Sequence, residues 1–167
     1  MTDILGAFEV FKVAEKIEIN GAEFYSKQAQ IAKNEEASKL FKRLEKAEIG
    51  HRKKFHQMHG DISPEERKLK NFSGDQSSYL EALADENVFV LREIGDYSNF
   101  NVNESVYANV NESVYAAIQV EQASIDLYEA IKPVVEKRHR KYVSAIAEQE
   151  YGHKKALLNL AKHLLKK

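Results

Sequence analysis

The tetrapeptide Glu48-Ile49-Gly50-His51 returns later in the chain as Glu150-Tyr151-Gly152-His153. Each copy follows a single glutamate, Glu18 or Glu121, at separations of 30 and 29 residues. A Glu and a His three positions apart on an α-helix differ by about 60° around its axis, so both lie on one face. The separation suits one long helix and a turn. Two lone glutamates and two Glu-x-x-His pairs, each on its own helix, form the ligand set of a dinuclear iron or manganese site in a four-helix bundle.

The composition favours a single helical domain. Residues 1–167 are predicted to form one domain, and this length is enough for a substantial core. The chain includes only two prolines and seven glycines, which favours helices. The formal net charge of −1 gives no reason to expect binding to nucleic acid or to a membrane.

The chain contains no cysteine. Disulfides, thiolate zinc sites and Cys-ligated iron–sulfur or rubredoxin-type centres are therefore excluded within it. Electrons for a redox site would have to come from another molecule. The first residues, MTDILGAFEVFK, lack the basic start and unbroken apolar run of a signal peptide, and a cytoplasmic location is expected.

Apolar residues at helical spacing predict an all-α four-helix bundle built from two helix pairs, and the long segment between the pairs indicates the ferritin-like form of that bundle. The first pair spans residues 4–58, with a break at Lys33-Asn34, and the second spans residues 103–165, with a break near Pro133. Residues 60–102 are too many for a tight turn between antiparallel neighbours. They suit one long crossover between helices two and three.

An identical octapeptide, NVNESVYA, occurs twice in succession, at Asn101–Ala108 and at Asn109–Ala116. Eight residues turn a helix by about 80° beyond two full turns, so Tyr107 and Tyr115 cannot fill equivalent core positions on one straight helix. The second copy is therefore predicted to start the third helix, and the first copy to be a tolerated extension.

The four motif glutamates lie among large apolar residues on the predicted inner faces. Four buried carboxylates without cations would cost many kcal/mol or would have to be protonated. Two divalent ions supply four positive charges, and one imidazole completes the ligands of each ion. The predicted metal ligands, which would also carry any catalysis through the metals, are Glu18, Glu48, His51, Glu121, Glu150 and His153.

Aligning the two halves of the sequence implies a pseudo-twofold axis through the bundle, with the metal pair straddling it. By this symmetry Glu48 and Glu150 are expected to bridge the metals, and Glu18 and Glu121 to bind terminally. Carboxylate oxygens with one imidazole per metal suit iron or manganese better than a structural zinc. Two iron ions are the expected cofactor, with manganese or zinc as substitutes.

Two tyrosines and four further histidines lie outside the predicted ligand set. Tyr25 and Tyr128 each lie seven residues after a lone glutamate, two turns along the same face. They either hydrogen-bond the ligand carboxylates or act as ordinary core aromatics, and the sequence leaves both readings open. Surface or helix-end positions, rather than metal binding, are predicted for the remaining histidines, which are His56, His59, His139 and His163.

The chain resembles the single-domain members of the rubrerythrin branch of the ferritin-like superfamily. The resemblance rests on Glu18-x-x-Gly21-x-x-Phe24-Tyr25, Glu48-x-x-His51, Glu121 with Leu127-Tyr128, and Glu150-x-x-His153. It implies a di-iron site that reduces hydrogen peroxide or dioxygen in a homodimer, with electrons from an external donor protein.

Two features depart from the peroxidases of that family. These commonly carry a C-terminal rubredoxin domain, for which this chain has no cysteines, and a further glutamate one turn after the third-helix ligand, where this chain has Ser124. Two other functions therefore remain open. One is iron binding, storage or delivery without turnover, as in ferritins, and the other is a metal-free interaction bundle that keeps the motif.

Overall fold

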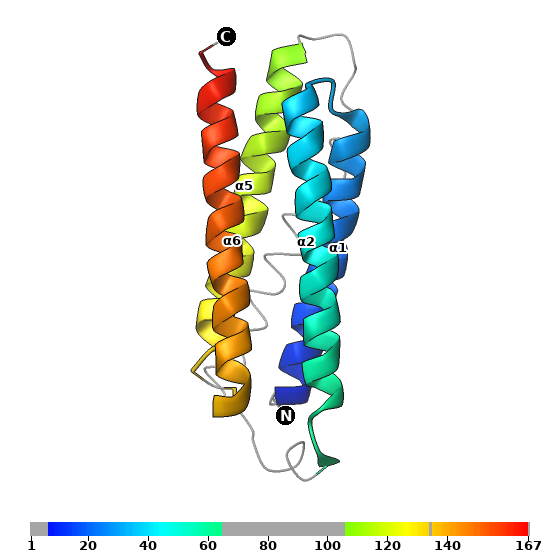
Figure 1. Cartoon of the computed structure of the whole chain (residues 1–167), viewed down its shortest axis with the longest axis vertical. Coiled ribbons are helices and arrows are strands. Elements are labelled where there is room, and N and C mark those ends of the chain that lie inside the picture. The colour runs from blue at the N-terminus through cyan, green and yellow to red at the C-terminus, as the bar shows by residue number, and fades with distance from the viewer. Residues whose placement is uncertain (1–6, 65–105, 134, 167) are drawn as a thin grey trace, which may run out of the picture.

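The computed structural model describes residues 7–64, 106–133 and 135–166. Four helices make up nearly all of this part of the chain, and it contains no strand (Figure 1). They are α1 (Ala7–Ile31), α2 (Glu35–Gly60), α5 (Val106–Ile131) and α6 (Lys137–Leu164). The predicted all-α four-helix bundle is confirmed.

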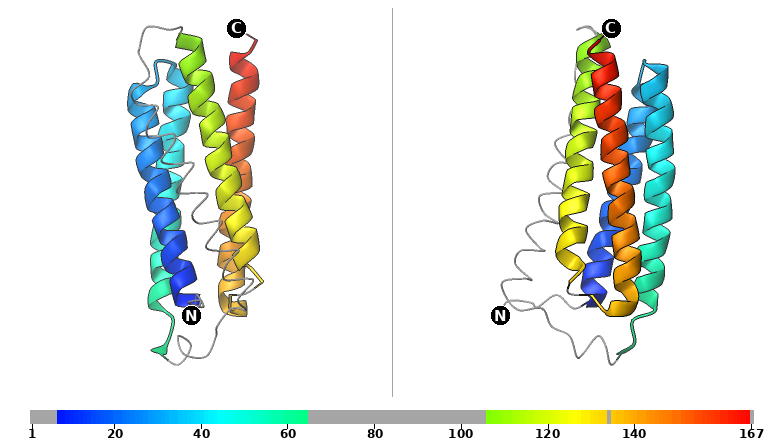
Figure 2. Two further views of the ribbon diagram at one scale, coloured as in Figure 1. Left: turned by 180° about the vertical axis from the view of Figure 1, so that it is seen from behind. Right: turned by 60° about the vertical axis from the view of Figure 1, so that its left-hand side comes forward.

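The bundle consists of two antiparallel hairpins, α1 with α2 and α5 with α6 (Figures 1 and 2). The hairpins meet where α2 faces α6 and α1 faces α5. In Figure 1, α2 ends at the bottom of the bundle, whereas α5 begins at the top, so these two helices run parallel. Consecutive helices that run parallel require a connection that returns from one end of the bundle to the other. The predicted crossover, residues 60–102, lies almost entirely outside the described residues.

Local sequence fixes the hairpin ends. The Asn34 side chain accepts a hydrogen bond from the Ala37 backbone N–H at 3.0 Å and caps α2. The acidic pair Glu35 and Glu36 follows in the first turn, where negative charge favours a helix. In the second hairpin, the Arg140 guanidinium donates to the carbonyls of Val135 and Pro133 at 3.0 and 3.1 Å, and so holds the turn between α5 and α6.

The predicted start of the third helix is wrong. Helix α5 begins at Val106, inside the first copy of the duplicated octapeptide, rather than at the second copy. The last residues of the first copy continue the helix toward its N-terminus. The described part of α5 has 26 residues, and α6 has 28 residues.

The core divides into two apolar clusters stacked along the bundle. One cluster includes Phe11, Ile17, Phe55, Met58, Leu127, Tyr128, Ile131, Val143 and Ile146. The other cluster includes Phe24, Tyr25, Phe41, Leu44, Val114, Val120, Leu157 and Leu160. Polar residues interrupt each helix between the two clusters, and none of the described helices is apolar over a length that would span a membrane.

Candidate metal centre

The layer between the two apolar clusters contains all six motif side chains. Each helix contributes from its inner face, with Glu18 on α1, Glu121 on α5, and one Glu-x-x-His pair each on α2 and α6. All four glutamates are at most 2% exposed, and His51 is 4% exposed. The His153 side chain is the most open of the six, at 17% exposed.

The six side chains form two overlapping groups. Glu18 and His51 join one group, and Glu121 and His153 join the other, while Glu48 and Glu150 belong to both. Within each group the candidate ligand atoms lie within 4.8 Å of one another. Two ions held by these groups would share the two common carboxylates.

The imidazoles approach the carboxylates through Nδ1. His51 Nδ1 lies 2.8 Å from Glu150 Oε1 and 3.4 Å from Glu18 Oε2. His153 Nδ1 lies 2.8 Å from Glu150 Oε2 and 3.5 Å from Glu121 Oε2. The two rings lie side by side, with centroids 5.7 Å apart and planes inclined by 22°. Glu150 is therefore the carboxylate that contacts both histidines.

Without metal, this layer can be neutralised only by protons. Burial and the charge of Glu150 raise the pKa of Glu121 to about 8. Burial, together with nearby carboxylates, likewise raises the pKa of Glu48 well above its ordinary value. Burial alone would raise the pKa of Glu150 too, but contacts with the two histidines lower it to about 2.

The pKa values of both histidines are also raised, although burial by itself lowers them. Burial disfavours their charged forms, but contacts with Glu150 and Glu18 raise the pKa of His51 to about 11. Contacts with Glu121 and Glu150 raise the pKa of His153 to about 9. Protons thus occupy the positions that cations would take, which is the behaviour of a site with excess buried negative charge.

The donor atoms of this layer fit a metal pair. Three buried carboxylate oxygens have no hydrogen-bond partner, namely Glu18 Oε2, Glu48 Oε1 and Glu121 Oε2, and the close pair of Glu150 Oε1 and His51 Nδ1 is not aligned as a hydrogen bond. Buried polar atoms are normally satisfied, so a set of unsatisfied atoms directed at one region points to a missing partner. Carboxylate oxygens and imidazole nitrogens suit divalent first-row transition ions.

The two tyrosines contact the glutamates across the pseudo-twofold axis. The Tyr25 hydroxyl donates to Glu121 Oε1, and the Tyr128 hydroxyl donates to Glu18 Oε1. Each ring packs in an apolar cluster, Tyr25 against Phe41 and Tyr128 against Phe55. Burial raises the pKa of both phenols well above the ordinary value, so both hydroxyls keep their protons. Each tyrosine thereby orients a glutamate of the other helix pair.

Gly21 leaves room for a carboxylate shared by both groups. A Cβ atom at this position would lie 2.7 Å from Glu48 Oε2, closer than real Cβ contacts. The sequence pointed to Gly21 only as part of the family motif, because the contact joins different helices. The equivalent position in the second half is Ser124, which is buried at 2% exposure.

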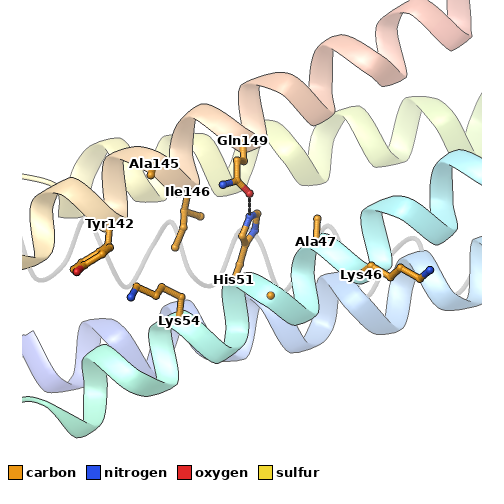
Figure 3. Close-up of a pocket in the computed structure, with 9 residues that line it drawn as sticks. Lys46, Ala47, His51, Lys54, Tyr142, Ala145, Ile146 and Gln149 are labelled. Carbon is orange, nitrogen blue, oxygen red and sulfur yellow. Dashed lines mark hydrogen bonds between the residues drawn. The ribbon is translucent and has the colours of Figure 1, made fainter.

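Gln149 contacts the candidate metal centre but belongs to none of the sequence motifs. Its Oε1 lies 2.9 Å from His51 Nε2, the ring nitrogen directed away from the carboxylates (Figure 3). The contact lies in a cavity of about 370 Å³ between α2 and α6, which is also lined by Lys46, Lys54 and Tyr142. The only feature of the sequence that could have indicated Gln149 is its position one residue before Glu150. His51 therefore separates this outer cavity from the buried carboxylates.

The remaining histidines occupy varied environments. His56 and His163 are exposed, as predicted. His139 lies near the start of α6, but it is buried at 4% exposure and packs edge-on against Phe11 at 5.2 Å. His139 therefore occupies the predicted helix-end position, but its side chain is buried rather than exposed. The basic sequence around it hid its inward direction, which follows from its spacing to Val143 on α6.

The protein is a ferritin-like four-helix bundle with a buried layer of carboxylates and histidines that can hold metal ions. These features place it in the class of di-metal carboxylate proteins. The rubrerythrin family model matches residues 9–161. The chain belongs to the rubrerythrin family. Neither the curated proteins nor the solved structures yielded a match.

Proposed function

We propose that this protein is a di-iron oxidoreductase that reduces hydrogen peroxide or dioxygen with electrons from a separate donor protein. The observation that carries the proposal is the pair of ligand groups that share Glu48 and Glu150. In this arrangement Glu18 and His51 would hold the first ion, Glu121 and His153 would hold the second, and Glu48 and Glu150 would be available to both. Family membership supports the same assignment.

The chemistry that two bound iron ions supply is the transfer of two electrons, which together with two protons convert one hydrogen peroxide into two water molecules. The side chains contribute position and charge. Four carboxylates balance the charge of two divalent cations, and the apolar clusters above and below keep water out of the layer.

The tyrosines and the outer cavity have supporting parts in this proposal. Tyr25 and Tyr128 keep their protons and hold the terminal glutamates in place, so those carboxylates do not need to reorganise during turnover. The cavity beside His51 and Gln149 admits solvent and a small oxidant, and only the His51 side chain separates it from the buried carboxylates.

A single-turnover experiment tests the proposal. The protein is loaded anaerobically with two ferrous ions per chain and mixed with one equivalent of peroxide, and oxidation is followed by absorbance. Rapid oxidation of both ions by a single peroxide, without release of radicals, is expected. Slow oxidation that does not follow this stoichiometry would contradict peroxide reduction. A Glu48→Gln variant is the control, because it lacks one shared carboxylate.

The competing function is iron storage or delivery without turnover. A storage protein needs a closed shell to hold mineral, so the mass in solution separates the two functions. We expect a homodimer that holds no more than two central iron ions per chain. A large shell with a mineral core would favour storage instead.

A further inference from the structure

A second set of ligand-type side chains lies on the α1–α2 hairpin, outside the central layer. Glu15 comes from α1, and His56 and His59 are one turn apart on α2. Glu15 Oε1 lies 3.0 Å from His56 Nδ1, and one candidate ligand atom from each of the three side chains lies within 4.8 Å of the others. No sequence pattern links Glu15 to the two histidines, because Glu15 lies 41 positions before His56.

We propose that Glu15, His56 and His59 bind a third divalent transition-metal ion, separate from the central pair. Two imidazoles and one carboxylate are a ligand set that suits zinc, ferrous iron and their neighbours. Three protein ligands leave further coordination positions for water. The site is thus of the open, exchangeable kind, unlike the central layer.

The surroundings favour a site that forms without opening the bundle. The Glu15 side chain is only 15% exposed, so its carboxylate is held in place against the hairpin. The His56 side chain is 72% exposed, so an ion can arrive directly from solvent. The central layer is built in the same way. There, two ligands one turn apart on one helix are joined by further ligands from neighbouring helices.

One positive group competes for the same carboxylate. Arg52 Nε lies 3.8 Å from Glu15 Oε1, at the long end of an ion pair, and its side chain is 51% exposed. An ion pair this long, with one partner half exposed, contributes little, so a metal ion that binds two imidazoles as well can displace the guanidinium. Removing the Arg52 charge should then strengthen metal binding.

The second helix pair lacks such a set. The positions that correspond to Glu15, His56 and His59 in the sequence repeat are occupied by Ile118, Leu158 and Ala161, none of which can ligate a metal. The proposal therefore assigns one outer ion to each chain. It does not depend on what the central pair does chemically.

The test is a cobalt titration of the full chain and of a His56→Ala/His59→Ala double variant, with bound metal counted after removal of free ion. The double variant should bind one ion per chain fewer than the unaltered protein, with nitrogen-ligated cobalt absorbance reduced accordingly. Equal counts would overturn the proposal. Because the readout is a difference, it holds whether or not the central layer fills with two ions.

Three single variants sharpen this test. His163→Ala is the matched control, because His163 is also an exposed histidine, 3.5 Å from Glu36, and should leave the count unchanged. Glu15→Gln should weaken the outer ion by at least about tenfold. Arg52→Gln should tighten it. If Arg52→Gln weakens the outer ion, or if Glu15→Gln leaves its affinity unchanged, the ion is not held by Glu15 and the proposal fails.

Discussion

The two helix pairs present the same candidate ligands to the central layer but surround them differently. Gln149 contacts the outer nitrogen of His51, whereas the corresponding position beside His153 is Ala47. The His51 side chain is 5% exposed, and the His153 side chain is 17% exposed. One turn after the lone glutamates, the first pair has Gly21 and the second has Ser124.

This difference separates two kinds of constraint. The ligand positions repeat because each half of a metal pair needs the same donors at the same helical spacing. The neighbouring positions affect only how firmly each donor is held and how readily solvent reaches it. They have diverged, so the two metal positions should differ in rigidity and in exchange rate.

The largest expected effect separates the two shared carboxylates. In metal-free protein, contacts with the two histidines lower the pKa of Glu150 to about 2, whereas burial and nearby carboxylates raise the pKa of Glu48 well above its ordinary value. Glu150→Gln should therefore lower the free energy of unfolding by about 3–5 kcal/mol, the cost of breaking a buried ion pair. Burial already disfavours the charged form of Glu48, so Glu48→Gln, which keeps the shape of the side chain, should cost less than about 1 kcal/mol.

Denaturant unfolding of both variants in the presence of a chelator measures this contrast. Both variants should also lose metal, because each lacks a shared ligand. Similar unfolding free energies for the two variants would contradict the assignment of the negative charge to Glu150.

The next effect concerns pH. Folding raises the pKa of Glu121 from 4.5 to about 8 and that of His153 from 6.5 to about 9. In both windows the folded, metal-free protein binds more protons than the unfolded chain, so its stability falls as pH rises. Between pH 6.5 and 8 the unfolding free energy should fall by about 1.4 kcal/mol per pH unit for each such proton.

Saturating manganese should remove this pH dependence or reverse its sign, because bound cations replace the protons. Unfolding midpoints at pH 6.5 and 8, with chelator and with manganese, provide the measurement. Glu121→Gln should flatten the slope of the metal-free protein. A metal-free protein that becomes more stable over this range would rule out the protonated layer.

Gly21 and Ser124 offer a smaller, more selective contrast. Gly21→Ala should push the end of the Glu48 side chain aside, because the added Cβ would meet Glu48 Oε2 at 2.7 Å. The helix itself gains about 1 kcal/mol from alanine, so metal-free stability should change little. Metal affinity should fall by about 10–100-fold, as when a supporting contact is lost.

Ser124→Ala is the matched control for Gly21→Ala, since it also places an alanine one turn after a lone glutamate. It should leave metal affinity within a few-fold of the unaltered protein. Competition with a coloured chelator measures both. Equal affinities for the two variants would show that Glu48 does not need the space beside Gly21.

Sequence patterns were sufficient for the bundle and for the candidate ligands because both follow from local spacing. The i, i+3 pairs and the apolar stripes fix which side chains share a helix face. The start of α5 at Val106 was missed because the duplicated octapeptide carries no signal that distinguishes its two copies. The buried position of His139 was missed because its neighbours in sequence are basic.

Contacts between helices could not be derived in this way. The Tyr25–Glu121 hydrogen bond joins residues 96 positions apart, and the His51–Gln149 contact joins residues 98 positions apart. Spacing placed Tyr25 on the correct face but left its partner undecided. The outer set of Glu15, His56 and His59 likewise needed the register of α1 against α2, which depends on core packing.

The smallest expected effect tests the Gln149 contact itself. Gln149→Ala removes the hydrogen-bond partner of His51 Nε2 and makes the two helix pairs alike at this position. Because Gln149 is exposed, metal affinity should fall by no more than about tenfold, below the usual range for a buried supporting contact. The kinetic effect should be clearer, since a loosened His51 ring releases its metal more readily.

Exchange of bound metal for an isotope measures this directly. The unaltered protein should show two phases, a fast one from the His153 position and a slow one from the His51 position. In Gln149→Ala the slow phase should approach the fast one. Ala47→Gln is the complementary variant, because it offers His153 the partner that His51 already has, and it should slow the fast phase. If both variants kept the exchange pattern of the unaltered protein, the unequal rates would have to arise from the difference in burial between the two histidines rather than from Gln149.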